Sequence, residues 1–400
     1  MAGKPGAAPD VLIVGGGVIG CAIAYACAAA GLAVTLIESE RLGAGASGAA
    51  AGMLAPQVEA HQPDDFFAFG LAGRAEHARL APQLLADVGL DVEYRQTGIL
   101  RLALEEREAV DLRGRAAWQA SQGLAAEWLA PQDVGRLEPA FAGAAGRRLV
   151  GALWLPEEGQ VRSPRLVRAL AAAAIRRGAT FREGLPALAL ERDGDRIRGV
   201  QTPAGRLQAG TTVLAAGAWS GALAAGAGLH LPVEPIKGQI IALGSLQHAP
   251  RHILWSGQCY VAPKADGLVI VGATEERAGF DRRPTLSGML QLALGATELL
   301  PELGRLSVET QWGGLRPAVP DRLPVIGWAA GCRNLLFATA HFRNGVLLGP
   351  LTGKLVTELL QGQEPSWDLT PYTPQRLSLL DGGEQGRAYA IRPYDRPGSS

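Results

Sequence analysis

The hydrophobic pattern near the N-terminus predicts a strand, a helix and a second strand. Residues 11–14 are all apolar and mostly β-branched, which is typical of a strand buried in a parallel sheet. A glycine-rich turn follows, and then an alanine-rich stretch that predicts a helix ending at Gly31. Residues 33–38 are a second apolar run that ends in Glu38. The whole segment has the length of about thirty residues that a βαβ unit needs.

Apolar runs farther along the chain extend this first domain. Residues 163–179 predict a helix, with Ser163 as its N-cap, Pro164 at its first position and Gly178 near its end. Buried strands are predicted at 211–220, where the run enters a glycine turn, and at 334–340. These pieces predict a doubly wound, Rossmann-like domain assembled from three separate stretches. The stretches are residues 10–90, 150–225 and 310–367.

Between these stretches the pattern changes to that of antiparallel strands, and this predicts a second, inserted domain over residues 91–149 and 226–309. The fold class is therefore α/β, or α+β overall, with an antiparallel-sheet domain inserted into a Rossmann-like one. Residues 368–400 are charged and rich in glycine, and we expect a peripheral C-terminal tail there. The predicted strands of the insert are 94–104, 233–243, 259–263 and 267–274, and its predicted helices are about 105–121 and 286–300.

Composition narrows the classes of function. The chain has 400 residues, with 38 basic and 38 acidic side chains, and this balance argues against nucleic acid as a partner. Its four cysteines form no CxxC pair and no zinc-type cluster, so we expect no metal and a reduced, cytoplasmic protein. Residues 11–37 carry no charge but contain five glycines, so we expect no stable membrane insertion.

The glycine-rich turn has the pattern of a dinucleotide-binding site. Gly15, Gly17 and Gly20 form GxGxxG between the first strand and the helix. They would allow a tight turn, a close approach to a pyrophosphate, and packing of helix on strand. Glu38, which ends the second strand, would accept hydrogen bonds from a ribose diol and disfavour NADP. The alternative is a glycine-rich turn that binds nothing, with Glu38 at a solvated strand end.

The choice between FAD and NAD depends on the residues after Glu38. The run "SERLGAGASGAAAGMLAP" over residues 39–56 is suited to a backbone pressed against a large planar ligand. Met53, Leu54 and Pro56 favour an ordered loop over a flexible linker. The chain has no second fingerprint of the kind that two-dinucleotide reductases need. These features favour FAD, while an NAD-binding or purely regulatory protein stays an alternative.

Four pieces of sequence carry a resemblance to a known family. They are "GGGVIGCAIAYACAAAG" with Glu38, "ASGAAAGMLAP" (46–56), "GGLRPAVPDRLPVIG" (313–327) and "HFRNGVLLGP" (341–350). Over residues 10–367 the chain resembles the D-amino-acid-oxidase-like family of FAD enzymes and, within it, the glycine oxidases of thiamine biosynthesis. The resemblance implies an FAD-binding domain in the three outer stretches and a substrate-binding domain in the insert.

The resemblance also implies a reaction. FAD, held non-covalently, would accept a hydride from the α-carbon of a small amino acid such as glycine, and oxygen would take the electrons to give hydrogen peroxide. The imine would give a keto acid and ammonia, and from glycine it would supply iminoglycine or glyoxylate for thiamine biosynthesis. A homotetramer is implied as well. The open alternative is a D-amino-acid dehydrogenase that passes electrons to a quinone or another acceptor.

The predicted substrate site is a clamp for a carboxylate. Arg316 and Arg343 lie in apolar surroundings, and a guanidinium can grip a carboxylate through two parallel hydrogen bonds. The resemblance adds the hydroxyl of Tyr260. No catalytic side chain is expected, because the flavin carries the chemistry. Glu275 stands where the family commonly has an apolar residue, so a cationic or small substrate would suit a Glu275 that faces the pocket.

The predicted cofactor contacts come from the fingerprint and from positions that match the family. The role of His341 stays open, and Asn344 and Gly345 would begin a helix that points at the N1–C2=O edge of the flavin. The full set is Gly15, Gly17, Val18, Ile19, Gly20, Glu38, Ser39, Ala46, Ser47, Ala51, Gly52, Met53, Ala187, His341, Phe342, Arg343, Asn344, Gly345, Val346 and Leu347.

Overall fold

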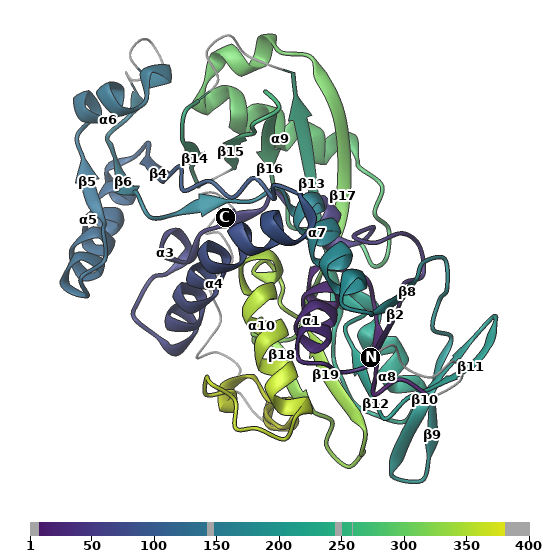
Figure 1. Cartoon of the computed structure of the whole chain (residues 1–400). Coiled ribbons are helices and arrows are strands. Elements are labelled where there is room, and N and C mark those ends of the chain that lie inside the picture. Colours follow the sequence, from purple (N-terminus) through teal and green to yellow (C-terminus); the bar gives the residue numbers. More distant parts are fainter. Residues whose placement is uncertain (1–7, 142–147, 245–249, 258, 381–400) are drawn as a thin grey trace.

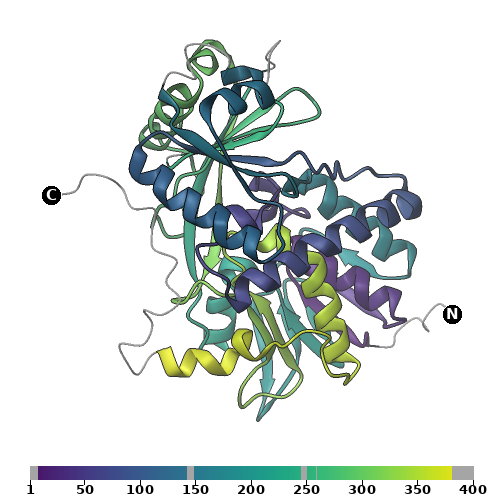
Figure 2. The ribbon, with the colours of Figure 1, turned by 90° about the vertical axis from the view of Figure 1, so that its left-hand side faces the viewer.

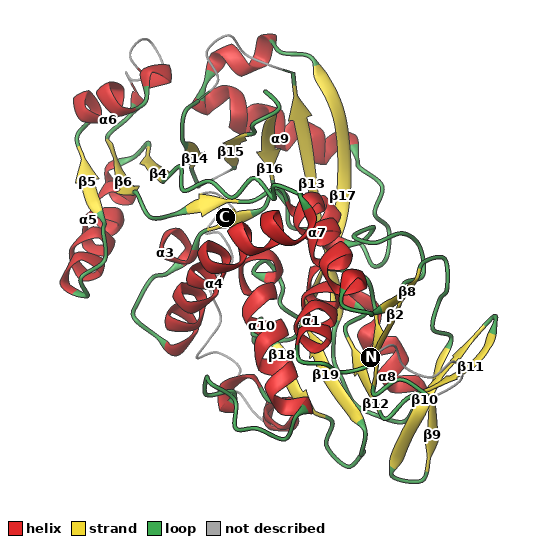
Figure 3. Cartoon of the chain, in the orientation of Figure 1, coloured by secondary structure: helices red, strands yellow, loops and turns green. Residues whose placement is uncertain are grey.

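Two large β-sheets organise the chain, and the helices lie against their faces (Figures 1 and 3). The computed structural model describes residues 8–141, 148–244, 250–257 and 259–380. Within these residues the first sheet has six strands and the second has eight. The second sheet occupies the upper part of the molecule and the first sheet the lower part, in the view of Figure 1 and in the turned view of Figure 2. The predicted mixed α/β class is confirmed.

The first sheet is built around the predicted βαβ unit. Its central strand β1 pairs in parallel with β2 on one side and with β12 on the other, and the edge strand β18 runs antiparallel to β19. The order of strands is β18–β19–β12–β1–β2–β8. Their bounds are β1 Val11–Val14, β2 Val34–Ile37, β8 Thr180–Arg182, β12 Thr211–Leu214, β18 Val325–Trp328 and β19 Leu335–Thr339.

Both faces of the first sheet are covered, which explains why its strands are apolar on both sides. Side chains of β1 alternate between two cores: Val11 and Ile13 face the helices, and Leu12 and Val14 face the other layer. The helical layer contains α1 (Val18–Ala29), α7 (Ser163–Arg176) and α10 (Gly345–Leu360), with α4 (Asp65–Val88) packed outside them. The other layer contains α8 (Ser220–Gly226) and the small sheet of β9 (Ala189–Asp193), β10 (Arg196–Thr202) and β11 (Gly205–Gln208).

The second sheet carries the residues that approach the site from the opposite side. Its order is β17–β13–β16–β15–β14–β4–β6–β5, and most neighbouring strands are antiparallel. Helices α6 (Pro131–Leu137) and α9 (Leu286–Leu299) pack on one face, and α5 (Glu106–Ser121) packs on the other. The strand bounds are β4 Ile99–Ala103, β5 Glu127–Leu129, β6 Gly151–Leu155, β13 Glu234–Leu243, β14 Ile253–Trp255, β15 Tyr260–Pro263, β16 Val269–Gly272 and β17 Val308–Ala318.

The small-residue run after Glu38 is an ordered segment between the two sheets. It contains α2 (Ala46–Ala49) and β3 (Met53–Leu54), and α3 (Pro56–Glu59) begins at its last residue. β3 pairs with β7 (Gly159–Gln160). Leu54 is fully buried and Pro56 is buried, in line with the expectation of an ordered loop. This segment therefore presents a fixed backbone to the space between the sheets.

Local details differ from the sequence expectations. Ser163 is the first residue of α7 and not its N-cap, which is Arg162, and the Ser163 hydroxyl donates to the carbonyl of Ser47 at 2.5 Å. The strand predicted at 211–220 ends at Leu214, because a 3₁₀ turn begins at Gly217. The strand predicted at 94–104 is shorter, at Ile99–Ala103.

The domain boundaries stay a prediction, and two strands bear on them. β6 and β17 belong to the second sheet, although their residues fall largely within the outer stretches 150–225 and 310–367. Of the predicted tail, residues 368–380 form short turns and α11 (Leu377–Leu380), and Tyr372 is fully buried against Phe69. Residues 381–400 lie outside the described part of the chain.

Candidate active site

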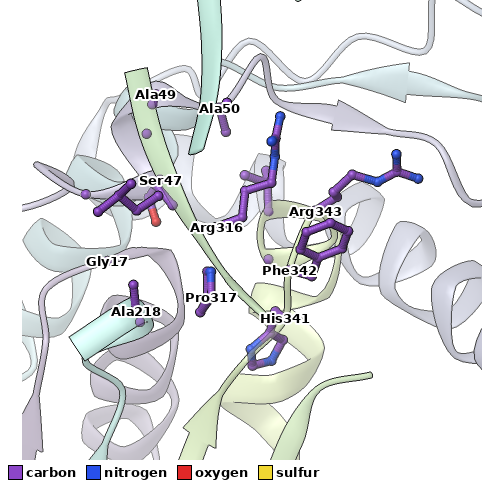
Figure 4. Close-up of a pocket in the computed structure, with 18 of the residues that line it drawn as sticks. Gly17, Ser47, Ala49, Ala50, Ala218, Arg316, Pro317, His341, Phe342 and Arg343 are labelled. Carbon is purple, nitrogen blue, oxygen red and sulfur yellow. The ribbon is translucent and has the colours of Figure 1, made fainter. Parts of the chain in front are cut away.

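One large cavity lies between the two sheets. Its volume is about 1220 Å³, which exceeds the usual range for drug-sized ligands, roughly 300–1,000 Å³. At one end its wall is the glycine-rich turn after β1, and at the other it is the second sheet with Tyr260 and Arg316. Figure 4 shows Gly17 and Ser47 on one side and Arg316 and Arg343 on the other. The predicted cofactor and substrate regions therefore share one space.

The glycine turn is shaped by close backbone contacts. Gly15 has φ +111°, and a Cβ on it would lie 2.4 Å from the carbonyl oxygen of Ala215 in the turn after β12. A Cβ on Gly20 would lie 1.9 Å from the carbonyl oxygen of Gly15. Because no side chain fits at either position, the turn packs backbone against backbone on the segment after β12 and on the start of α1. Gly17 and Val18, at the N-terminus of α1, line the cavity.

Polar groups beside the turn fix its geometry. One carboxylate oxygen of Glu38 accepts from the backbone N–H of Gly16 at 2.7 Å, and the other accepts from the Ser39 hydroxyl at 3.0 Å. The hydroxyl oxygen of Ser47 accepts from the N–H of Val18 at 2.9 Å. This last bond ties the segment after β2 to the first turn of α1.

These features fit a bound FAD. Gly15 and Gly17 of the turn line the cavity at the N-terminus of α1, Glu38 lies on the cavity wall beside them, and the lining continues to residues of α2 and β3. At the far side the first residues of α10, Gly345 and Val346, also line the cavity. A helix N-terminus carries partial positive charge and suits the electron-rich edge of a ring system.

Arg316 reaches the cavity from β17. Its guanidinium lies flat over Gly238 of the neighbouring strand β13, where a Cβ would approach its Nη2 to 2.3 Å, and its Nη1 donates to the carbonyl of Thr274 at 3.0 Å. Burial lowers the pKa of Arg316, with Tyr260 acting in the opposite direction. Among the described residues no carboxylate lies at ion-pair distance from this guanidinium. An arginine in this condition is suited to an anionic ligand.

Tyr260 lies on the adjoining part of the same sheet. It begins β15, and its hydroxyl passes over Gly272 of β16, where a Cβ would lie 2.3 Å from the oxygen. Its ring packs against Trp255 with centroids 5.7 Å apart. Glycines on the neighbouring strands thus clear the space that Tyr260 and Arg316 occupy.

Arg343 is in a different electrostatic state from Arg316. Its Nη2 donates to the Oε2 of Glu59 in α3 at 2.9 Å, and both side chains are mostly buried. The guanidinium also lies 5.7 Å from the centre of the Phe342 ring. The two arginines point in different directions in Figure 4. Arg343 therefore already holds one carboxylate, so its predicted role as a substrate clamp stays a prediction.

Glu275 lines the cavity, but its charge is paired. Its Oε1 accepts from Arg322 at 2.8 Å, and Arg322 in turn lies over the Phe342 ring at 4.9 Å. About a third of the Glu275 side chain is exposed. The wall at this point is a neutralised ion pair instead of a free carboxylate, which weakens the expectation of a cationic substrate.

His341 is buried at the start of the turn before α10. Its Nε2 lies 2.9 Å from the hydroxyl of Thr352, while its Nδ1 has no hydrogen-bond partner among the described residues. Burial lowers the pKa of His341 to about 3. The imidazole is therefore neutral at neutral pH, and it adds no positive charge to the cavity.

The turn that carries Phe342 and Arg343 has an unusual backbone. Ala340 has φ +59° and Phe342 has φ +48°, a conformation that non-glycine residues rarely adopt. The N–H of Phe342 donates to the carbonyl of Pro317 at 3.0 Å, which joins the turn to the end of β17. Such strained residues are concentrated at functional sites.

Most of the predicted site residues share the cavity. Three of them do not line it. Gly20 packs on the glycine turn, the carbonyl oxygen of Ala51 accepts a hydrogen bond from Lys264, and Leu347 packs on Gly70 of α4. The predicted residues that line it are Gly15, Gly17, Val18, Ile19, Glu38, Ser39, Ala46, Ser47, Gly52, Met53, Ala187, Tyr260, Arg316, His341, Phe342, Arg343, Asn344, Gly345 and Val346.

The sequence expectations missed two charged residues here. Glu59 follows the small-residue run by three positions. Its place as a single acid next to a segment expected to contact a ligand could have marked it as a candidate site residue. Arg322, the partner of Glu275, lies in the loop after β17. Apart from its presence in the "RPAVPDR" segment, nothing in the sequence indicated that it lies near the site. Both act through partners far away in the chain.

Two further expectations concern metal binding and membrane insertion. Within the described ranges no group of three or more His, Cys, Asp or Glu side chains could hold a metal ion. None of the described helices is long and apolar enough to cross a membrane. The four thiols are free and buried.

Comparison with known proteins gives a consistent result. Residues 10–359 match the family DAO, described as FAD dependent oxidoreductase. The chain is 36% identical to the glycine oxidase of Geobacillus kaustophilus over 372 residues, which cover 92% of this chain and 97% of that protein. It is 35% identical to the bifunctional protein ThiO/ThiG of Synechocystis sp., with 92% of this chain and 54% of that protein covered. The crystal structure of the Geobacillus kaustophilus glycine oxidase has a TM-score of 0.87 at 35% identity, covering 91% of this chain and 98% of that one.

Proposed function

This chain belongs to the FAD dependent oxidoreductase family, and from that premise we propose that it oxidises glycine or another small primary or secondary amino acid. The products are an imine or keto acid, ammonia and hydrogen peroxide. The relatives that carry the name glycine oxidase support the choice of glycine, and the ThiO/ThiG relative supports a role in supplying thiamine biosynthesis.

The state of Arg316 carries this proposal. Its guanidinium faces a cavity that the glycine-rich turn after β1 also lines, and its hydrogen bond among the described residues goes to the neutral carbonyl of Thr274. The carboxylate of an amino acid would supply the missing negative charge, and a bidentate pair would fix the orientation of the α-carbon. We expect the hydroxyl of Tyr260, which is on the same sheet, to donate to the same carboxylate.

The remaining groups bind and exclude rather than transfer protons. FAD, when bound, supplies the redox chemistry by accepting a hydride equivalent from the α-carbon and passing electrons to oxygen. His341 is neutral, and its Nδ1 is buried beside the space that the ring system would occupy. No base among the described residues is needed if the substrate amine binds in its neutral form. The chain orients the substrate, excludes water from the cavity wall and supplies the partial positive charge at the start of α10.

Peroxide formation under air is the direct test. Purified yellow protein is mixed with glycine, sarcosine and D-alanine in turn, and peroxide is measured with a coupled peroxidase. We expect peroxide from at least one of these amines. Bleaching of the yellow colour by an amine, with very slow return under air, would instead favour a dehydrogenase that uses a quinone or another acceptor. A colourless protein would contradict FAD binding itself.

We also propose that the protein is a cytoplasmic homotetramer. Exposed leucines on one row of α9 support self-association: Leu286, Leu290 and Leu294 are 82%, 56% and 60% exposed. Exposed apolar patches of this kind often mark contacts between proteins. Light scattering coupled to size exclusion gives the mass of the assembly, and a monomer of 41.7 kDa would contradict the proposal.

A further inference from the structure

Two oppositely charged residues, 284 positions apart in the chain, close one wall of the cavity. Glu59 of α3 and Arg343 of the turn before α10 form an ion pair at 2.9 Å, and both line the cavity. Their side chains are 17% and 19% exposed. Arg316 lies near enough for the charges of Arg343 and Glu59 to act on its pKa. Of these two arginines, one is neutralised from within the protein and the other is not.

The position of Glu59 is held by a cluster of buried polar side chains around α3. Glu158 accepts from the backbone N–H groups of Gln57 and Val58, at 3.1 and 3.2 Å. The Gln119 amide donates to the carbonyl of Gln57 at 2.9 Å, and Arg115 donates to the carbonyl of Val58. Backbone groups at both ends of this short helix are therefore tied to the surrounding elements.

Arg74 of α4 completes the cluster. It donates to Glu158 at 3.0 Å, to the side chain of Gln57 at 2.6 Å and to Glu157 at 2.7 Å. A four-residue helix has little stability of its own, and burying this many polar groups is unfavourable unless each one is satisfied. Such a cluster of hydrogen bonds is expected where a helix must hold one side chain in a fixed position. The side chain that α3 presents to the cavity is Glu59.

From this geometry we infer that Glu59 restricts the cavity to amino acids with a single carboxylate, and that Glu158 is a positioning residue that holds Glu59 in place. The inference rests on the proposed function, because it assumes that Arg316 binds the substrate carboxylate. A second carboxylate on the substrate would meet Arg343, the other cation whose charge acts on Arg316. It would find that charge already neutralised and would face the negative charge of Glu59, and such an unpaired like charge is strongly disfavoured.

The expected substrate class is defined by charge. Glycine, alanine and N-methylated glycine each have one carboxylate, which pairs with Arg316, and they bring no second negative charge toward Glu59. Aspartate and amino-dicarboxylic acids of similar length carry a second carboxylate, which would face Glu59. Glu59 thus acts on specificity by repulsion, while Arg316 acts by attraction.

Binding of simple anions to the yellow, FAD-bound protein tests this without turnover. Acetate is the one-carboxylate probe and malonate the two-carboxylate probe, and each is titrated while the flavin absorption spectrum is followed. In the wild type we expect acetate to bind and malonate to bind much more weakly. In Glu59→Gln the ion pair with Arg343 and the negative charge of Glu59 are both lost, and the affinity for malonate relative to acetate should rise by about tenfold or more.

Glu157→Gln is the matched control. Glu157 is also bonded to Arg74, but it does not line the cavity, and its side chain is 42% exposed. This variant should keep the wild-type ratio of malonate to acetate affinity. A yellow Glu59→Gln protein that responds to acetate but keeps the wild-type ratio would overturn the inference. A protein without flavin would instead contradict the proposed function.

The positioning role of Glu158 has its own readout. Glu158→Gln should shift the malonate-to-acetate ratio in the same direction as Glu59→Gln, and the double variant should shift it no further than Glu59→Gln does. Additive shifts, or a variant that only loses stability, would remove Glu158 from the inference. If Glu158→Gln yields no folded protein, Glu158→Asp, which shortens the reach to the two N–H groups, decides in its place.

Discussion

Arg316 and Arg343 differ in what surrounds each guanidinium, and this difference determines their expected roles. Arg316 donates to a neutral carbonyl, while Arg343 donates to a carboxylate. Substitution at Arg316 should therefore weaken substrate binding more directly than substitution at Arg343. The comparison also shows why two arginines in similar sequence surroundings cannot be assigned the same role from their flanking residues.

For Arg316→Ala we expect the apparent KM for glycine to rise by about tenfold to a hundredfold, because a charge-assisted hydrogen bond is lost. FAD should stay bound, since Arg316 lies on the second sheet while the glycine turn after β1 belongs to the first. Steady-state peroxide assays give KM, and the flavin absorbance of the purified variant gives FAD content. An unchanged KM would exclude Arg316 from substrate binding.

For Glu275→Met we expect a change in the ranking of glycine, sarcosine and D-alanine. The variant replaces a paired carboxylate with an apolar wall and releases Arg322, so a substrate that carries a methyl group should gain by up to about tenfold in kcat/KM over glycine. The ratio of kcat/KM values for the three amines is the measurement. The same ranking in variant and wild type would show that Glu275 does not contact the substrate.

Among the secondary-structure elements, the sequence predicts best where the pattern is local. The first strand, the glycine turn and the following helix lie where the apolar periodicity and the GxGxxG spacing predicted them, because all of their determinants are within about thirty residues. The pair of Glu59 with Arg343 could not be predicted from the sequence, since 284 positions separate its members. Ser163 shows the same limit: its hydroxyl bonds to Ser47 across the fold instead of capping its own helix.

The contact between α1 and α10 allows a test with two glycines in different surroundings. A Cβ on Gly353 of α10 would lie 2.6 Å from the backbone oxygen of Ala22, so Gly353→Ala should lower the free energy of unfolding by about 1–3 kcal/mol. Gly114 of α5 is exposed with nothing within 4 Å of its Cβ position, so Gly114→Ala should raise it by about 0.5–1 kcal/mol. Chemical denaturation of both variants gives the two values, and a Gly353→Ala protein as stable as wild type would contradict the close packing of the helices.

In the whole molecule, two buried ionisable groups lie where segments from the two sheets meet. Glu158 holds α3, and Lys264, just after β15, donates to the carbonyl of Ala51 at 2.6 Å and to Gln160. Burial raises the pKa of Glu158 to about 7 and lowers the pKa of Lys264 to about 7. Folding therefore favours the neutral form of each group relative to the unfolded chain.

These shifts predict how stability varies with pH. Between pH 4.5 and 7 the folded protein retains the Glu158 proton that the unfolded chain releases, so this contribution is lost as pH rises. Between pH 7 and 10.5 the unfolded chain binds the Lys264 proton and the folded one does not, so stability rises with pH. The slope for one proton is at most about 1.4 kcal/mol per pH unit.

Denaturation curves at a series of pH values check both signs. Glu158→Gln should flatten the fall in the free energy of unfolding below pH 7, and Lys264→Met should flatten the rise above it. Identical pH dependence in wild type and variants would contradict the assigned shifts. The comparison with wild type is needed because other groups titrate in the same range.

The strand β17 has a consequence for how this protein can change over evolutionary time. It pairs with β13 in unbroken register from Thr310 to Ala318, a Cβ on its Gly314 would lie 2.6 Å from the Ala49 side chain, and Arg316 comes two residues later. Side chains on a strand alternate between faces, so losing or gaining one residue before Arg316 would turn the guanidinium out of the cavity. We therefore expect homologous lineages to vary this strand by exchange of residues and not by insertion or deletion. The number of residues in this strand should stay constant among homologues, while substitutions around it can change which amine is oxidised.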